Sequence, residues 1–138
     1  MGLHGLDGYL IEVQVDVSAG LPSWEVVGLP DTSVKESKER VKTAIKNSDM
    51  DFLSRRILIN LAPANTRKEG SLFDLPIAIG ILIATEFIIN NNISQYAFIG
   101  ELSLDGKIRK SKGVLPMCIE AKRLGIKNIV LPYENAKE

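Results

Sequence analysis

Cysteine and histidine are almost missing from this sequence of 138 residues, which contains only Cys118 and His4. A single cysteine cannot form an internal disulfide, which fits a reducing cytoplasm, and its apolar helical surroundings favour a buried thiol over a nucleophile. A single histidine leaves a zinc-type site without ligands and disfavours a catalytic triad. We therefore expect no metal and no other cofactor in this domain.

Membrane and targeting segments are also missing. The N-terminus has no basic segment followed by an apolar run, as a signal peptide would require. The most apolar stretch, residues 75–89, is interrupted by Pro76, Gly80 and Glu86 and is too short to span a bilayer. These features predict a cytoplasmic protein with no membrane partner. The charged end of the chain suggests a domain that belongs to a longer protein.

No charge of one sign dominates, because 17 basic residues balance 17 acidic ones. The first 30 residues nevertheless contain four acidic residues and no basic one, so local patches matter more than the sum. A phosphate-binding P-loop, GxxxxGK[ST], does not occur. The nearest candidate, Gly106-Lys107, lacks the earlier glycine and the hydroxyl residue that should follow. The chain is therefore not expected to bind a nucleotide by itself.

The hydrophobic pattern predicts strands that alternate with three helices. Alternation of apolar and polar residues predicts a half-buried strand at residues 9–17, and shorter strands are expected at 24–27, 56–61, 96–99 and 128–131. A hairpin is expected at residues 101–109, with Asp105-Gly106 in its turn. Strands that alternate with helices predict a single α+β (two-layer α/β) domain, residues 1–138, in which a mixed sheet is covered by helices.

Each predicted helix has a recognisable start. A capping box formed by Ser33 and Glu36 should begin the first helix, which runs to about Ser48, and Asp74 should cap the second. The second helix is apolar nearly all round and must be buried on several sides. The third is expected at residues 115–124. The first helix has an inner apolar stripe and an outer row of lysines, which we interpret as a solvated face (Val34, Val41, Ala44 and Ile45 inside; Lys35, Lys38, Lys42 and Lys46 outside).

Two clusters of basic residues are candidates for binding nucleic acid. Four basic residues in six follow the hairpin turn, and two more lie in the loop after residue 62 (Lys107, Arg109, Lys110 and Lys112; Arg67 and Lys68). If the clusters share one face, they would contact DNA phosphates without reading bases. The alternative is that lysines on an edge strand only prevent aggregation. Trp24 is expected to pack in the core or against a hairpin.

Three long motifs resemble a known family. They are GLPSWEVVGLPDTSVKESKERVKTAIKNS at 20–48, RILINLAPANTRKEGSLFDLPIAIGIL at 56–82, and GELSLDGKIR at 100–109, followed by PYENAKE at 132–138. The chain is similar to the N-terminal domain of the magnesium-chelatase-like AAA+ proteins, the family of YifB and the competence protein ComM. The resemblance implies a homo-hexameric parent protein that acts on branched or single-stranded DNA. Its ATPase module, which would bind ATP and magnesium, is absent from this chain.

The same domain resembles the proteolytic domain of Lon and the C-terminal domain of RadA, a fold related to the second domain of a ribosomal protein. Lon-type proteases use a serine nucleophile and a lysine base, and ungapped matching places Leu72 and Leu115 at these positions. A leucine can neither attack a carbonyl group nor accept a proton. Ser71 lies one place too early, and the nearest basic residue to the second position is Lys112. The resemblance therefore implies a domain that is not an enzyme.

Two other functions remain as alternatives, and a third has no support in the sequence. The first is a protein-interaction or oligomerisation module without DNA contact, in which residues 20–30 around Trp24 form a subunit interface. The second is a degenerate Ser–Lys protease domain that uses Ser71. The third, magnesium insertion into a porphyrin, lacks the cluster of oxygen ligands that magnesium requires.

Overall fold

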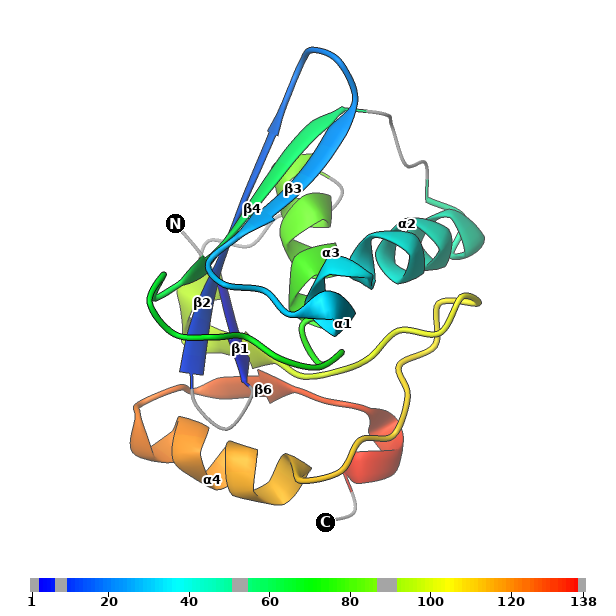
Figure 1. The fold of residues 1–138 in the computed structure, drawn as a ribbon. Helices are drawn as coiled ribbons and strands as arrows, with labels where there is room; N and C mark the ends of the chain where they lie inside the picture. The colour runs from blue at the N-terminus through cyan, green and yellow to red at the C-terminus, as the bar shows by residue number, and fades with distance from the viewer. Residues whose placement is uncertain (1–2, 7–9, 51–54, 87–91, 137–138) are drawn as a thin grey trace.

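The computed structural model describes residues 3–6, 10–50, 55–86 and 92–136. Its centre is a mixed sheet of six strands in the order β3-β4-β2-β1-β5-β6 (Figure 1). The strands are β1 (Leu3–Leu6), β2 (Leu10–Ser18), β3 (Ser23–Val27), β4 (Arg56–Ala62), β5 (Tyr96–Phe98) and β6 (Asn128–Val130). Strand β2 runs antiparallel to β1 and β4, while the pairs β1–β5, β3–β4 and β5–β6 are parallel. This arrangement confirms the predicted α+β fold with a mixed sheet.

Strand β1 had no signal in the sequence. It has only four residues and includes Gly5. Its apolar and polar residues do not alternate, because both faces of the strand are buried: Leu3 packs into the main core and Leu6 into a second cluster. Pairing with β2 and β5 on its two sides makes it a central strand. The predicted strand start at Tyr9 lies outside the described residues, and β2 is described from Leu10.

The predicted alternation along β2 is confirmed. Ile11 and Val13 are fully buried, and Val15 and Val17 pack against the same core. Helix α3 lies over this face of the strand. The intervening polar residues lie on the opposite face, where the side chain of Gln14 donates to Glu12 and accepts from Asn60.

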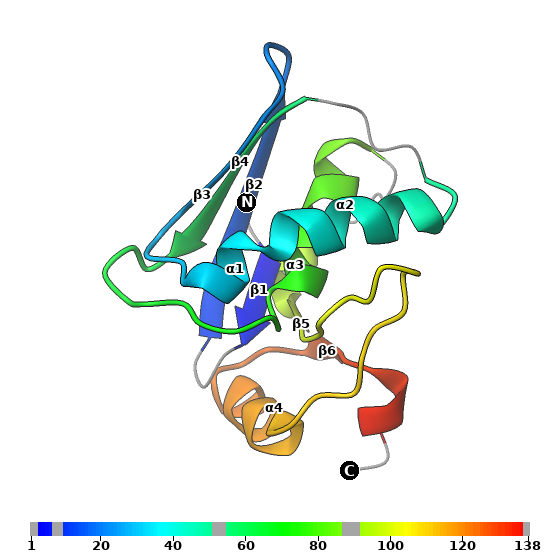
Figure 2. The same cartoon turned by 45° about the vertical axis from the view of Figure 1, so that its right-hand side comes forward.

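Helices cover both faces of the sheet. They are α1 (Thr32–Lys35), α2 (Ser37–Asn47), α3 (Asp74–Ala84) and α4 (Val114–Arg123), with short 3-10 turns η1 (Ile93–Gln95) and η2 (Tyr133–Asn135). Helix α2 lies across α3 on one face (Figure 2). Helix α4 packs on the other face, because Phe98 joins the main core while the neighbouring Ala97 and Ile99 join the cluster that contains Val114 and Ala121.

The predicted capping box of the first helix is wrong. Asp31 is the N-cap, and its Oδ1 accepts a hydrogen bond of 2.8 Å from the Val34 amide. The helix is also not continuous, since it breaks at Glu36 between α1 and α2. At this break the Arg40 guanidinium donates to the Ser33 carbonyl at 2.7 Å. The expected inner residues Val34, Val41, Ala44 and Ile45 are all buried.

Helix α3 is apolar on nearly every side, as predicted, and forms the centre of the core. Its buried residues include Leu75, Ile77 and Ile81, each of which contributes about 1.5–3 kcal/mol on burial. Pro76 lies in the first turn, where its missing amide hydrogen costs little. Residues 87–89 of the predicted helix lie outside the described part of the chain.

The predicted cap of this helix is wrong. Asp74 is its first residue, Phe73 is the N-cap position, and no side chain caps the helix there. The Asp74 carboxylate instead accepts hydrogen bonds from Arg40 and from the Leu102 amide. A carboxylate at this position still interacts favourably with the positive end of the helix dipole.

Candidate functional site

The loop that follows β4 is fastened to the start of α1. The Lys68 amide donates to the Leu29 carbonyl, and the Asp31 amide donates to the Lys68 carbonyl, both at 2.9 Å. Asp31 Oδ2 also accepts from the Gly70 amide at 3.1 Å, while Oδ1 caps α1. One carboxylate therefore fixes both the helix start and the loop that resembles the nucleophile loop of Lon.

Lys68 points into the protein rather than toward solvent. Its relative exposure is 0%, and its ammonium group donates to the Pro63 carbonyl. Burial lowers the pKa of this ammonium group, because the charged form loses hydration. The expectation that Lys68 contributes to a DNA-binding surface is therefore wrong. Its neighbour Arg67 is exposed and lies 3.4 Å from the Glu69 carboxylate.

The end of this loop is locked to the segment that precedes the hairpin. The Gly100 amide donates to the Leu72 carbonyl at 3.3 Å, and the Leu75 amide donates to the Gly100 carbonyl at 3.0 Å. The Leu72 side chain is half-buried and packs against the second cluster, whereas Leu115, on α4, is 47% exposed. Within the described residues, the Ser71 hydroxyl accepts no hydrogen bond from a lysine ammonium.

A buried ion pair ties α2, α3 and the hairpin together. Arg40 donates to Asp74 through Nε at 2.7 Å and through a terminal nitrogen at 3.1 Å, and the Leu102 amide donates to the same carboxylate at 3.1 Å. Burial raises the pKa of Asp74, and the hydrogen bond from Arg40 offsets only part of this effect. The same hydrogen bond raises the pKa of Arg40. The only sequence signal for this pair was a charged residue at the start of an apolar helix.

The hairpin forms where the sequence predicts it. The Ser103 amide donates to the Lys107 carbonyl at 2.9 Å, and the Arg109 amide donates to the Glu101 carbonyl at 2.9 Å. Gly106 adopts a φ of 93°, a conformation that glycine adopts without strain. The hairpin rests on the end of α2, where the Asn47 side chain donates to the Leu104 carbonyl at 2.7 Å.

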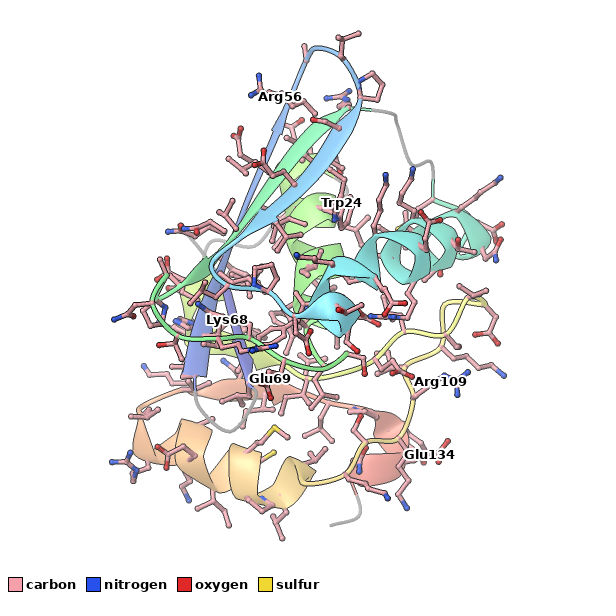
Figure 3. The ribbon with its side chains drawn as sticks, in the orientation of Figure 1. Trp24, Arg56, Lys68, Glu69, Arg109 and Glu134 are labelled. Carbon is pink, nitrogen blue, oxygen red and sulfur yellow. The ribbon has the colours of Figure 1, made fainter. Side chains whose placement is uncertain are left out.

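The structure gathers four of the predicted basic residues and separates the others. Lys107, Arg109, Lys110 and Lys112 are all exposed and lie in the segment between the hairpin turn and α4. Arg109, which is labelled in Figure 3, lies 3.4 Å from the Glu101 carboxylate. The loop after β4 and the hairpin tip lie on opposite sides of the molecule in both ribbon views. The two basic clusters therefore do not form one continuous face.

A third group of basic residues was missed by the sequence pattern. Lys38, Lys42 and Arg55 line a cavity beside Trp24, although the two lysines had been assigned to a solvated helix face. Trp24 is half-buried and packs against the main core, as predicted. The available signal was the spacing of the lysines, since residues four apart lie on the same side of a helix.

Two further properties concern metals and membranes. Within the described ranges, no three side chains of histidine, cysteine, aspartate or glutamate are grouped closely enough to hold a metal ion. In the same part of the chain, no helix has the length and apolar character needed to cross a bilayer.

The chain is similar to several known proteins. Residues 13–135 match the family model described as subunit ChlI of Mg-chelatase. The chain is 44% identical to YifB of Salmonella typhimurium and 39% identical to the competence protein ComM of Haemophilus influenzae, in both cases over 134 residues. Each match covers 97% of this chain and 26% of the relative.

The similarity extends to Lon proteases. The chain is 31% identical to Lon protease 2 of Bacillus subtilis over 145 aligned positions, which cover 93% of this chain and 26% of that protein. The chain thus spans about a quarter of the length of these curated relatives. Since the family model covers most of the chain, the chain belongs to the family of Mg-chelatase ChlI subunits that includes YifB and ComM.

Proposed function

We propose that this chain is a non-catalytic domain of a Mg-chelatase-like AAA+ ATPase and that it supports DNA binding by the whole protein. The parent protein would be a homo-hexamer whose separate ATPase module binds ATP and magnesium. Its substrate would be branched or single-stranded DNA. The relative named competence protein ComM supports this proposal, because competence is the uptake of DNA.

The observation that carries the proposal is the exposed basic segment at residues 107–112. Four of its six side chains are cationic and solvent-exposed. The hairpin hydrogen bonds hold the first part of the segment, and the Asn135 side chain fixes its end by accepting from the Ser111 amide at 2.9 Å and donating to the Ser111 carbonyl at 2.8 Å. A preorganised row of cations contacts the phosphates of DNA without reading the bases. Arg67, on the other side of the molecule, would contact a different part of the DNA or a neighbouring subunit.

The proposal of a non-catalytic domain depends on Leu72 and Leu115, which occupy the positions that match the Lon nucleophile and base. Leu72 contributes its carbonyl to a backbone hydrogen bond and its side chain to the second apolar cluster. Leu115 presents an apolar side chain to solvent. Neither side chain provides the hydroxyl or amine that acyl transfer requires.

The test is a charge-reversal variant in which Lys107, Arg109, Lys110 and Lys112 are all replaced by glutamate. We expect weaker DNA binding and a smaller salt dependence, by about 0.9 units of log–log slope for each lost phosphate contact. The matched control reverses four exposed lysines elsewhere, so that both variants have the same net charge (Lys35, Lys46, Lys122 and Lys127). Equal binding by the two folded variants would refute the proposed interface.

A second function, assembly without DNA contact, has its own supporting observation. The segment around Trp24 exposes two large apolar side chains, Leu21 at 89% and Leu29 at 53%. Exposed leucines of this kind occur in protein–protein interfaces. Sedimentation of the 138-residue chain with and without branched DNA separates the two functions, because only an assembly module would self-associate and show no DNA complex.

A further inference from the structure

An exposed aromatic side chain lies close to the basic segment, although the two are far apart in the chain. Tyr133 is 83% exposed and begins the short turn η2. The third residue of this turn, Asn135, is hydrogen-bonded to the amide and to the carbonyl of Ser111, which is 24 positions away. Ser111 lies between Lys110 and Lys112. Both ribbon views place η2 beside the segment that leads into α4 (Figure 1, Figure 2).

Its exposure distinguishes Tyr133 from the other aromatic residues that the structure describes. Phe73 and Phe98 are buried, while Trp24 and Tyr96 are half-buried and pack against the main core. Tyr133 belongs to neither of the two apolar clusters formed by the described residues. A single exposed apolar side chain is common on protein surfaces, so the informative feature is its position next to four cations.

The backbone around Tyr133 is well fixed. The Asn135 amide donates to the Pro132 carbonyl at 2.9 Å, and the Ala136 amide donates to the Tyr133 carbonyl at 3.1 Å. Asn135 is only 2% exposed, so water competes little for its hydrogen bonds to Ser111. Tyr133 lies two residues before Asn135, or about 4 Å along the axis of a 3-10 helix. A contact surface that is already rigid loses little conformational entropy when a ligand binds.

The charges near Tyr133 favour an uncharged group against its ring and phosphates along the basic segment. Glu134 is exposed in the same turn, and its carboxylate would repel a phosphate there. Residues 107–112 contain four cations and no acidic residue. Figure 3 shows Glu134 and Arg109 on the same side of the molecule. A nucleotide presents both kinds of group, since its base is uncharged and its phosphate is an anion.

This combination favours unpaired DNA over duplex DNA. Proteins that bind single strands use cations along the backbone together with aromatic side chains on which bases stack. In a duplex the faces of each base are covered by its neighbours, and a side chain can reach them only after the bases unstack. An exposed tyrosine therefore adds affinity for a single strand but little for a duplex.

We propose that Tyr133 stacks on an unpaired DNA base while the basic segment binds the phosphates of the same strand. The inference rests on the proposed function, because it requires that these cations bind DNA. It makes the ligand of this surface single-stranded DNA or the unpaired part of branched DNA.

The experiment adds the 138-residue chain to a fluorescently labelled single-stranded oligonucleotide, or to a duplex of the same length, and measures anisotropy at several salt concentrations. We expect Tyr133→Ala to weaken single-strand binding by about fivefold or more and to leave duplex binding nearly unchanged. The log–log salt slope should stay at the wild-type value, because no phosphate contact is lost. Tyr133→Phe keeps the ring and should bind like the wild type, whereas Tyr133→Leu keeps only an apolar contact and should bind like Tyr133→Ala.

The matched control is Leu124→Ala, which shortens an exposed side chain at the far end of α4 and should change neither affinity. Wild-type binding by Tyr133→Ala, or equal weakening for both DNAs, would overturn the stacking role. Full single-strand affinity in Tyr133→Leu would do the same, as would a change in self-association without a change in DNA binding. In each of these cases the proposed function survives if charge reversal of the basic segment still weakens binding. If the wild type binds neither DNA, both the proposed function and the stacking role are wrong.

Discussion

The guanidinium of Arg40 and the carboxylate of Asp74 form a bidentate ion pair, with 2.7 Å between Nε and Oδ2. The Asp74 side chain is 1% exposed and that of Arg40 is 23% exposed. The pair joins α2 to α3, and the Leu102 amide adds the hairpin to the same carboxylate. The relative positions of α2, α3 and the hairpin therefore depend on one buried charge.

Replacement of Arg40 by leucine should strongly destabilise the protein. The Asp74 carboxylate would remain buried without its charge partner, a change that typically costs about 3–5 kcal/mol. Urea unfolding at pH 7 measures this loss. The double variant Arg40→Leu/Asp74→Leu should recover part of it, because no unpaired charge remains. A single variant with wild-type stability would contradict the role assigned to the pair.

The same variant should change the pH dependence of stability. Burial already raises the folded-state pKa of Asp74 above its usual value. The group therefore favours folding at pH values below the unfolded pKa, and this contribution is lost as the pH rises through the folded pKa. Without Arg40 the folded pKa should rise further, so Arg40→Leu should lose more stability than the wild type between pH 4 and pH 7. If the free energy of unfolding changed with pH equally in Arg40→Leu and in the wild type over this range, the result would argue against a charged Asp74.

The buried Lys68 predicts a pH dependence of opposite direction. Burial lowers its folded-state pKa, so the lysine destabilises the fold below that value, and stability increases as the pH rises toward the ordinary lysine pKa. The variant Lys68→Met should lose this increase, which occurs as the pH approaches the ordinary lysine pKa of about 10.4. The exposed control Lys35→Met should keep it. The comparison requires only urea midpoints at several pH values.

Close packing of Gly80 against Val15 predicts a coupled pair. A Cβ atom at Gly80 would lie 2.5 Å from a methyl group of Val15, which is too close for a stiff β-branched side chain to accept. Gly80→Ala should therefore destabilise the protein by about 1–3 kcal/mol, despite the better helix propensity of alanine. In a Val15→Ala background the same change should be neutral or stabilising by up to about 1 kcal/mol. A double-mutant cycle measures this coupling.

The degenerate protease alternative predicts a specific activity. If Ser71 were a nucleophile, prolonged incubation with unfolded casein would produce fragments, and Ser71→Ala would abolish them. We expect no cleavage by either protein, since a one-residue shift of a nucleophile disrupts the geometry that catalysis requires. Cleavage by the wild type that disappears in Ser71→Ala would overturn the proposal of a non-catalytic domain.

Patterns within one segment were sufficient to predict most elements of the fold. The alternation along β2 and the apolar surface of α3 identify strand and helix because each depends on neighbouring residues and on a regular period. The motifs at residues 56–82 and 100–109 likewise identified the family. Strand β1 was missed because four residues are too few to show a period, and its position depends on pairing with β2 and β5.

Local sequence patterns indicate most strands and helices, the family, and the four cations within residues 107–112. The roles of the other charged residues depend on contacts between segments that are far apart in the chain. Lys68 is buried because its loop folds against Leu29, and Asp74 binds Arg40, which is 34 positions away in the chain. Trp24, Lys38 and Arg55 line one cavity although they lie on β3, on α2 and just before β4. The environment of a charged side chain is set by residues that are distant in sequence, so no local pattern could have predicted it.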